Sequence, residues 1–448
     1  MVDRIVDGWS RKLAGRIMRP AGFAVALALS GLATAPPALA ELPAMASVAA
    51  AAKYQVPARP MWTAHGDPRA ALSLIGLLET SKLDGLNPKK FKTKALKRAL
   101  RDAEDGDPRA MLRADTLLNR ALFDYVVALR SMSSGEWTVV DREARQGAPS
   151  GLTLLAQAAA APSLEAWVEG MAFMHPDYAV LRRELAFAGD RRDRTAQALL
   201  ALNLKRARLL PGGTGRYVVV NTAAQRLYMY EGGRVIDSMK VVVGKPEQPT
   251  PMMAALIRYT AVRPYWNLPT DLVAERIAPN VIKDGLPYLK QKGYVVLSDW
   301  GAKAKVVDPS TIDWEAVAAG RIELRVRQNP GPANAMGQMK FMFPNKQGIY
   351  LHDTPNKELL GEDARLFSAG CVRLEDAPRL AKWLYGKPLK VAKTGKPEQR
   401  IDIAKPVPVY LAYMTAVPSG SQIVFLEDIY GRDRAQFALA GSSRTAAR

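Results

Sequence analysis

Residues 349–376 read IYLHDTPNKELLGEDARLFSAGCVRLED and contain the one cysteine of the chain, Cys371, and one of its three histidines, His352. The alternation at the start predicts a strand that ends at His352, and the polar loop that follows is long enough to double back. A free thiol with a pKa of about 8.5 is mostly protonated at neutral pH, so a nucleophilic cysteine needs an activating base. The stretch therefore predicts a Cys371–His352 pair for thiol acyl transfer or hydrolysis.

Two neighbours of the cysteine fit the same chemistry. Gly370 allows a tight turn that exposes main-chain amides around Cys371 to a developing oxyanion. Arg373 can bind a substrate carboxylate through two parallel hydrogen bonds. Structural roles remain open at this point: Cys371 as a small buried hydrophobe, His352 bonded only to a loop carbonyl, and Arg373 bracing a nearby acidic side chain.

The histidines and the cysteine do not form a metal-binding pattern. His65, His175, His352 and Cys371 are scattered, with no CxxC or HExxH spacing among them, so we expect neither a metal nor another cofactor. His175 precedes a proline at a predicted helix start, which favours a capping or surface role. His65 lies in a loop and has no predicted function.

The first forty residues are typical of a secretory leader. A basic beginning is followed by the apolar run AGFAVALALSGLA (21–33) and by APPALA, which predicts cleavage between Ala40 and Glu41. The apolar run is shorter than the roughly 20 residues that a bilayer-spanning helix needs, so a cleaved leader is favoured over an anchor. No later segment is apolar enough to span. In a bacterium, export places the mature chain in the periplasm.

The 448-residue chain carries a formal net charge of +20, which favours polyanionic partners. Nucleic acid, anionic lipid and a carboxylate-bearing wall polymer all satisfy this charge. No helix-turn-helix, zinc-finger, RRM or KH signature is present, and export argues further against nucleic acid. A single cysteine excludes an intrachain disulfide, so the fold depends on packing.

Hydrophobic periodicity predicts an α+β chain, because apolar spacing of three and four gives way to alternation near PGGTG (211–215). After the leader we predict a linker at 41–65, a helical scaffold domain at 66–211, a mostly β catalytic domain at 212–393 with an inserted helical lid at 263–337, and C-terminal strands at 394–448 that pack on the two domains.

The motif HDTP–x12–SAGCVR (352–373) resembles the signature of the L,D-transpeptidase catalytic domain, which usually reads His, a gap, and Ser/Thr-His-Gly-Cys-x-Arg. Ala369 stands where most members have His. This variant, preceded by FPN, resembles the large periplasmic subgroup of YcbB type. Further segments carry the same resemblance: NLKRARLLP, VVVGKPEQPTP, PYWNLP, RVRQNPGPANAMG and VFLEDIYG. Together they cover most of the chain after the leader.

The resemblance implies roles for six residues: Cys371 as nucleophile, His352 as base, Tyr350, Ser368 and Gly370 near the oxyanion site, and Arg373 as the arginine after the cysteine. Family members commonly orient the histidine through a main-chain carbonyl, so Asp353 is not expected to be a triad carboxylate. The insertion at 263–337 corresponds to a mobile lid over the substrate.

The implied substrates are peptidoglycan stem peptides. Cys371 would attack a tetrapeptide stem at the bond between the L-centre of its diamino acid and terminal D-Ala, and an amine of a neighbouring stem would resolve the thioester into a 3→3 cross-link. Carbapenems would acylate the same sulfur. Resolution by water would make an L,D-carboxypeptidase, and resolution by a protein lysine would attach an outer-membrane protein to the wall. A non-catalytic wall-binding scaffold is the alternative from another class.

Overall fold

The computed structural model describes residues 60–63, 67–131, 135–301, 303–392, 394–420 and 422–445. The predicted leader (1–40), most of the predicted linker (41–65) and His65 lie outside these residues. Within the described part of the chain, no helix is long and apolar enough to cross a membrane.

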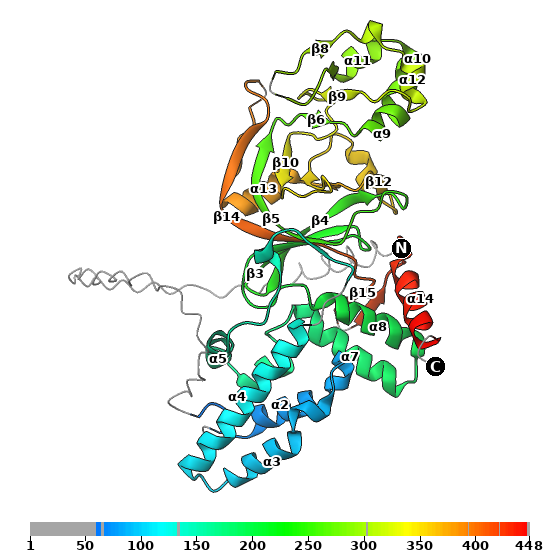
Figure 1. The fold of residues 1–448 in the computed structure, drawn as a ribbon. Helices are drawn as coiled ribbons and strands as arrows, with labels where there is room; N and C mark the ends of the chain where they lie inside the picture. The colour runs from blue at the N-terminus through cyan, green and yellow to red at the C-terminus, as the bar shows by residue number, and fades with distance from the viewer. Residues whose placement is uncertain are drawn as a thin grey trace, which may run out of the picture. The chain divides into compact units, whose positions relative to one another are not determined.

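The N-terminal part is helical, as predicted. Its helices are α2 (Arg69–Glu79), α3 (Thr93–Asp102), α4 (Pro108–Ser131), α5 (Gly151–Ala159), α6 (Leu164–Glu169), α7 (Pro176–Asp190) and α8 (Arg194–Ala207), with 3-10 turns η2 (Ser81–Asp84), η3 (Pro88–Phe91) and η4 (Arg142–Ala144). An Asp-Pro pair starts α4, where the Asp107 carboxylate accepts from the Ala110 amide at 3.0 Å and Pro108 is the first helical residue. Figure 1 shows these helices in blue to green.

His175 confirms one half of its prediction and corrects the other. It is the N-cap of α7, where Nδ1 accepts from the Asp177 amide at 3.2 Å. It is not at the surface, because only 1% of the residue is exposed. The stacked rings of Tyr217 and Tyr230 lie 6.1 and 5.1 Å from its own ring. His175 caps its helix from a position inside the core. The histidine–proline pattern indicates the helix start, but it carries no information about burial.

The catalytic part is built on one sheet that closes on itself. Its strands are β2 (Tyr217–Asn221), β3 (Arg226–Glu231), β4 (Arg234–Gly244), β5 (Met253–Val262), β10 (Met339–Met342), β11 (Leu351–His352), β12 (Leu366–Ser368), β13 (Val372–Leu374) and β14 (Gln399–Ala412). The path β5-β10-β11-β13-β4-β3-β2-β14 returns to β5, because β14 pairs with both β2 and β5. Inside, α13 (Ala377–Tyr385) contributes apolar side chains to the same buried cluster as the strands. The α+β prediction is confirmed.

The insertion, residues 263–337, has its own small core and contains a sheet that the helical prediction missed. Its helices are α9 (Thr270–Leu272), η5 (Val273–Ile277, a π-helical turn), α10 (Ala278–Asp284), α11 (Pro287–Lys292), η6 (Pro309–Thr311, a 3-10 turn) and α12 (Trp314–Ala318). Its sheet has the order β6 (Trp266–Asn267), β9 (Arg325–Gln328), β7 (Tyr294–Leu297), β8 (Val306–Val307). Strands of two to four residues are too short to show alternation.

The C-terminal segment also differs from its prediction as strands alone. After β14 come the hairpin β15 (Ala416–Ser419) with β16 (Gln422–Phe425) and then a helix, α14 (Arg432–Thr445). The helix begins at the charged run RDR, which has no apolar periodicity to mark it.

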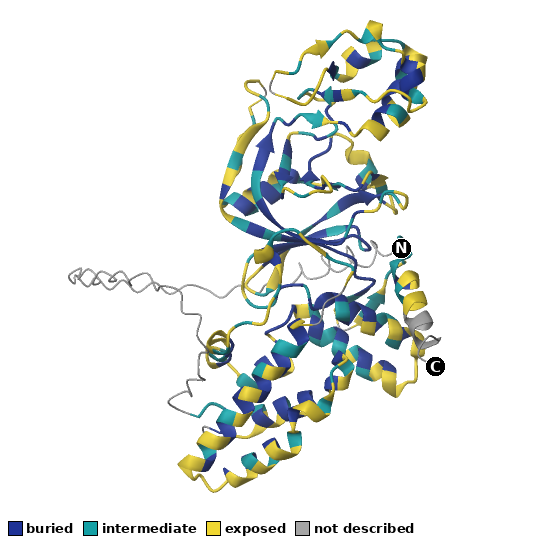
Figure 2. Ribbon diagram, in the orientation of Figure 1, coloured by how far each residue is buried: buried dark blue, intermediate teal, exposed yellow. Residues whose placement is uncertain are grey.

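Residues on both sides of position 212 share one interior. A short strand ahead of it, β1 (Thr138–Val139), pairs in parallel with β5, and the Asp141 carboxylate accepts from the Leu256 amide at 2.7 Å. One buried apolar cluster runs from the scaffold helices into β2, β3, β5 and β14. Figure 2 shows this buried interior in dark blue.

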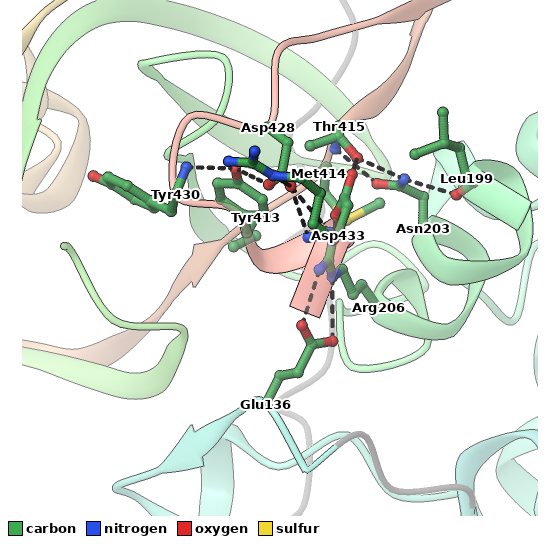
Figure 3. Close-up of polar contacts among 12 residues, drawn as sticks. Glu136, Leu199, Asn203, Arg206, Tyr413, Met414, Thr415, Asp428, Tyr430 and Asp433 are labelled. Atoms are coloured by element: carbon green, nitrogen blue, oxygen red, sulfur yellow. Dashed lines mark hydrogen bonds and ion pairs between the residues drawn. The ribbon is translucent and has the colours of Figure 1, made fainter. Parts of the chain in front are cut away.

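A buried ion cluster lies at the same junction (Figure 3). Arg206 of α8 is fully buried and pairs with Glu136 at 2.9 Å and with Asp433 of α14 at 2.6 Å. Asp433 also accepts from the Thr415 hydroxyl at 2.6 Å, and Thr415 is bonded in turn to Asn203 of α8. The cluster therefore ties the last scaffold helix to the C-terminal segment.

Candidate active site

The doubled-back loop predicted between His352 and Cys371 is present. β11 and β13 pair in parallel, with Leu351 opposite Val372 and His352 opposite Arg373. The Val372 amide donates to the Tyr350 carbonyl at 3.1 Å. Cys371 directly precedes β13 and His352 ends β11, so the two strands bring the motif residues to one place in the sheet.

The Cys371 sulfur lies beside the start of β11. The residue is of intermediate exposure, and Sγ lies 3.6 Å from the Gly348 carbonyl. Burial raises the pKa of the Cys371 thiol to about 11, against the opposing effects of hydrogen bonds from Tyr350 and the nearby charges of Arg373 and Lys340. Burial likewise raises the pKa of Tyr350 well above its ordinary value. The Tyr350 hydroxyl is therefore a neutral donor next to the sulfur.

His352 is held by the main chain rather than by a carboxylate. Its Nδ1 lies 2.5 Å from the Asp353 carbonyl oxygen, so a proton on Nδ1 leaves Nε2 as the free acceptor. Burial, and then the charge of Arg373, lowers the pKa of His352 to about 3. The ring also packs edge-on against Tyr350, with 5.7 Å between centroids. Tyr350 therefore contacts both the thiol and the imidazole.

The Asp353 side chain is engaged away from the histidine. Its carboxylate accepts from the Gln338 amide at 2.9 Å and pairs with Lys357 Nζ at 2.9 Å. These contacts join the residue that follows β11 to the residue that precedes β10 and to Lys357. They agree with the family-based expectation that a main-chain carbonyl orients His352.

Ser368 and Gly370 belong to the tight turn that carries Cys371, residues 368–371. The Ser368 hydroxyl donates to the Cys371 carbonyl at 2.5 Å and accepts from the Gly370 amide at 3.1 Å. Gly370 has φ +109°, which side-chain-bearing residues rarely adopt. In this structure the Gly370 amide is used inside the turn, so both residues fix the backbone of Cys371.

Thr250 also supports this turn, although no sequence motif marks it as a functional residue. Its hydroxyl donates to the Gly370 carbonyl at 2.8 Å and accepts from the Gly244 amide at 2.9 Å. The C-terminal segment donates two hydrogen bonds to the loop that carries Thr250. The Tyr430 hydroxyl donates to the Gly244 carbonyl and the Arg432 side chain donates to the Thr250 carbonyl, both at 2.8 Å. The only sequence signal is the Pro-rich stretch PEQPTP, which predicts a turn but no contact.

Replacing Thr250 by valine keeps the shape and removes both hydrogen bonds of the hydroxyl. We expect a loss of about 1–3 kcal/mol in the free energy of unfolding, because buried main-chain groups lose their partners. We also expect slower acylation of Cys371, because its turn is less fixed. Denaturant unfolding and intact-mass time courses measure the two effects. Thr250→Ser is the control and should retain both properties; equal behaviour of the two variants would exclude this role.

Arg373 faces a cavity of about 620 Å³ between the catalytic strands and the insertion. The two acidic residues near it in sequence lie against Arg379 instead, at 3.8 Å for Glu375 and 3.7 Å for Asp376. Thr354, Phe367 and Arg373 line the catalytic side of the cavity, whereas Cys371 and His352 do not line it. The cavity is therefore lined by Arg373, two residues after the thiol in sequence, and not by the thiol itself.

Within the described ranges, no three His, Cys, Asp or Glu side chains gather as metal ligands. The chemistry available to the described residues is that of a thiol, an imidazole, a phenol and nearby cations.

Comparison with known proteins gives matches over both parts of the chain. The sequence model of the L,D-transpeptidase catalytic domain (YkuD) matches residues 215–409, and that of the Scaffold domain matches residues 50–185. A Haemophilus influenzae protein named "Putative L,D-transpeptidase" is 35% identical over 241 residues, which are 52% of this chain and 48% of that protein. The chain thus spans about half the length of this curated relative.

Two solved structures are also similar. An L,D-transpeptidase from Mycobacterium smegmatis has 16% identity and a TM-score of 0.21, covering 44% of this chain and 59% of that one. L,D-transpeptidase 1 of Mycobacterium tuberculosis has 15% identity and a TM-score of 0.17, covering 45% and 63%.

Proposed function

Since this chain joins an L,D-transpeptidase catalytic domain to a Scaffold domain, we propose that it forms 3→3 cross-links in peptidoglycan through a thioester on Cys371. The two domain matches confirm the family resemblance predicted from the His352–Cys371 motif. The observation that carries the proposal is the gathering of Cys371, Tyr350 and His352 where β11 and β13 pair, beside a cavity.

In the proposed reaction, Cys371 gives its proton to Nε2 of His352 as the sulfur attacks the carbonyl carbon that joins the diamino acid to terminal D-Ala. The carbonyl oxygen takes negative charge, and the Tyr350 hydroxyl is placed to donate to it. The C–N bond then breaks, D-Ala leaves with the proton returned by the imidazolium, and a thioester remains.

An acceptor amine from a second stem peptide completes the cycle. It attacks the thioester carbonyl, passes a proton to His352, and expels the Cys371 sulfur, which takes the proton back as a thiol. Both groups are neutral in the resting site, because burial raises the thiol pKa and lowers the imidazole pKa. Proton transfer therefore accompanies attack on the substrate, and a stable thiolate–imidazolium pair is not formed beforehand.

The acceptor decides among the outcomes that share this thioester. Incubation of the protein with purified tetrapeptide muropeptides, followed by mass spectrometry, tests the proposal. A cross-linked dimer that has lost one D-Ala supports transpeptidation, whereas tripeptide alone identifies an L,D-carboxypeptidase. A protein–peptide conjugate with an added outer-membrane protein would identify wall attachment, and unchanged muropeptides would contradict the enzyme. We place this activity in the periplasm after removal of residues 1–40.

Replacing His352 by glutamine removes the base, and we expect acylation by a carbapenem to slow by about 10²–10⁴-fold at neutral pH. The loss should shrink as the pH rises, because the thiolate fraction of a thiol with a pKa of about 11 grows with pH up to that value. Intact-mass time courses between pH 7 and 10, each compared with the wild type, measure this recovery. A loss that stays constant with pH would assign the histidine a purely structural role.

A further inference from the structure

Two arginines from different parts of the fold face the same cavity. Arg373 extends from β13 of the catalytic sheet, and Arg276 extends from the π-helical turn η5 of the insertion; both line the 620 Å³ space. Lys292 lines it as well, and Glu275 is the one acidic residue among the lining side chains. The lining therefore carries an excess of positive charge.

The two guanidiniums lack acidic partners among the described residues. No ion pair is formed by Arg276 or Arg373, and Glu275 instead lies 4.0 Å from Lys245. Burial, and then the positive charge of Arg276, lowers the pKa of Arg373, whereas Cys371 and Glu358 oppose this shift. Because neither Glu275 nor Glu358 is paired with either guanidinium, the repulsion between the two like charges is reduced further when an anion binds between them.

The local backbone explains why Arg276 points into this space. Val273 and Ile277, the ends of the π-helical turn, are buried in the core of the insertion. The turn is held by the Asn280 side chain, which donates to the Arg276 carbonyl at 2.5 Å. Single π-helical turns inside α-helices are frequent at functional sites. Here it places Glu275, Arg276 and Asn280 on the cavity wall.

We propose that Arg276 and Arg373 together bind a carboxylate of the donor stem peptide, which makes Arg276 a specificity-determining residue supplied by the insertion. The inference rests on the proposed function. A guanidinium matches a carboxylate through two parallel hydrogen bonds, so a pair of them discriminates an acid from its amide. The stem has two such groups near the scissile bond: the side-chain carboxylate of the diamino acid and the terminal carboxylate of D-Ala.

Three synthetic tetrapeptide stems distinguish these sources: one with both carboxylates free, one with the diamino-acid carboxylate amidated, and one with the terminal carboxylate amidated. Release of D-Ala or D-alaninamide gives kcat/KM for each. For one of the two amides, we expect the kcat/KM of the wild type to be about 10–100-fold lower than for the stem with both carboxylates free. This is the range for a charge-assisted hydrogen bond to a buried group. For Arg276→Gln, we expect kcat/KM on the stem with both carboxylates free to fall by a similar factor relative to the wild type. Its kcat/KM on the discriminated amide should change little.

Lys283→Gln is the matched control, because Lys283 is an exposed residue of α10 in the same insertion and does not line the cavity. This control should keep the wild-type ratio of kcat/KM for the free acid to kcat/KM for the amide. Arg276→Lys retains the positive charge but lacks the planar guanidinium, so its ratio should lie between those of Arg276→Gln and the wild type. Carbapenem acylation of each variant checks that Cys371 is intact.

The outcomes separate this inference from the proposed function. If Arg276→Gln keeps the full acid-to-amide preference at both positions, the carboxylate is bound elsewhere and the inference is wrong, while the reaction stands. The same holds if the wild type shows no preference between acid and amide. If the wild type releases nothing from any stem and is not acylated by a carbapenem, the proposed function itself fails.

Discussion

The Cys371→Ala protein is expected to form no acyl-enzyme and to release no D-Ala, a fall of at least about 10⁴-fold in rate, the scale seen when the nucleophile of a covalent mechanism is lost. No second cysteine exists in the chain to replace it. Intact-mass measurement after exposure to a carbapenem should show one added drug molecule on the wild type and none on the variant. D-Ala release from purified tetrapeptide gives the second readout.

The fold of this variant should remain. Among the described residues, the polar contacts of the thiol are with the Gly348 carbonyl and Tyr350, and the turn around it is fixed by Ser368 and Thr250. We therefore expect a change of no more than about 1–2 kcal/mol in the free energy of unfolding. D-Ala release by Cys371→Ala would refute the assignment of the nucleophile. A wild type that ignores both an alkylating reagent and a carbapenem would favour the non-catalytic wall-binding scaffold.

Replacing Arg206 by methionine should produce the largest loss of stability, about 3–5 kcal/mol, because it leaves the buried Asp433 and the largely enclosed Glu136 carboxylates without their cation. Burial opposes the charge on Arg206, yet its contacts with Glu136 and Asp433 outweigh burial and raise its pKa. Methionine preserves much of the side-chain volume, so the loss reports the charge rather than a cavity. Urea unfolding followed by circular dichroism measures it.

Arg120→Met is the matched control on the same helical domain. Arg120 pairs with Asp124 one turn further along α4, at 2.9 Å, but both side chains are largely exposed. Exposed pairs of this kind contribute about 0.3–0.5 kcal/mol. Equal unfolding midpoints for the two variants would show that the buried cluster does not stabilise the junction. Adding Glu136→Gln and Asp433→Asn to Arg206→Met should recover part of the loss, because no uncompensated charge remains.

Local features of the fold were predictable from the sequence because their causes are local. The Asp107–Pro108 start of α4 depends on a cap within four residues, and the strands β2 to β4 follow β-branched runs separated by short turns. The pairing of His352 and Cys371 segments was predictable for a different reason, namely the family motif and a loop of suitable length. In each case, the information lies within about twenty-five residues of sequence.

Features that depend on distant contacts were not predictable in the same way. Thr250 reaches Gly370 across 120 residues, and nothing in PEQPTP indicates that contact. The strand β1 has two residues and lies in a scaffold segment, yet it pairs with β5 of the catalytic sheet. The electrostatics of the site are likewise a product of burial: the sequence supplies a thiol and an imidazole, but only their enclosure keeps both neutral.

The position of β14 in the sheet has a consequence for how the protein is made. β14 lies between β2 and β5 and bonds to both, with Val409 opposite Val218 on one side and Ala255 on the other. While a ribosome is still adding the intervening sequence, β2 and β5 have open edges that invite intermolecular strand addition. Ring closure then spans a long stretch of polypeptide and is slow. A nascent chain of this protein is therefore expected to depend on chaperones that hold it apart from its neighbours until β14 has been made.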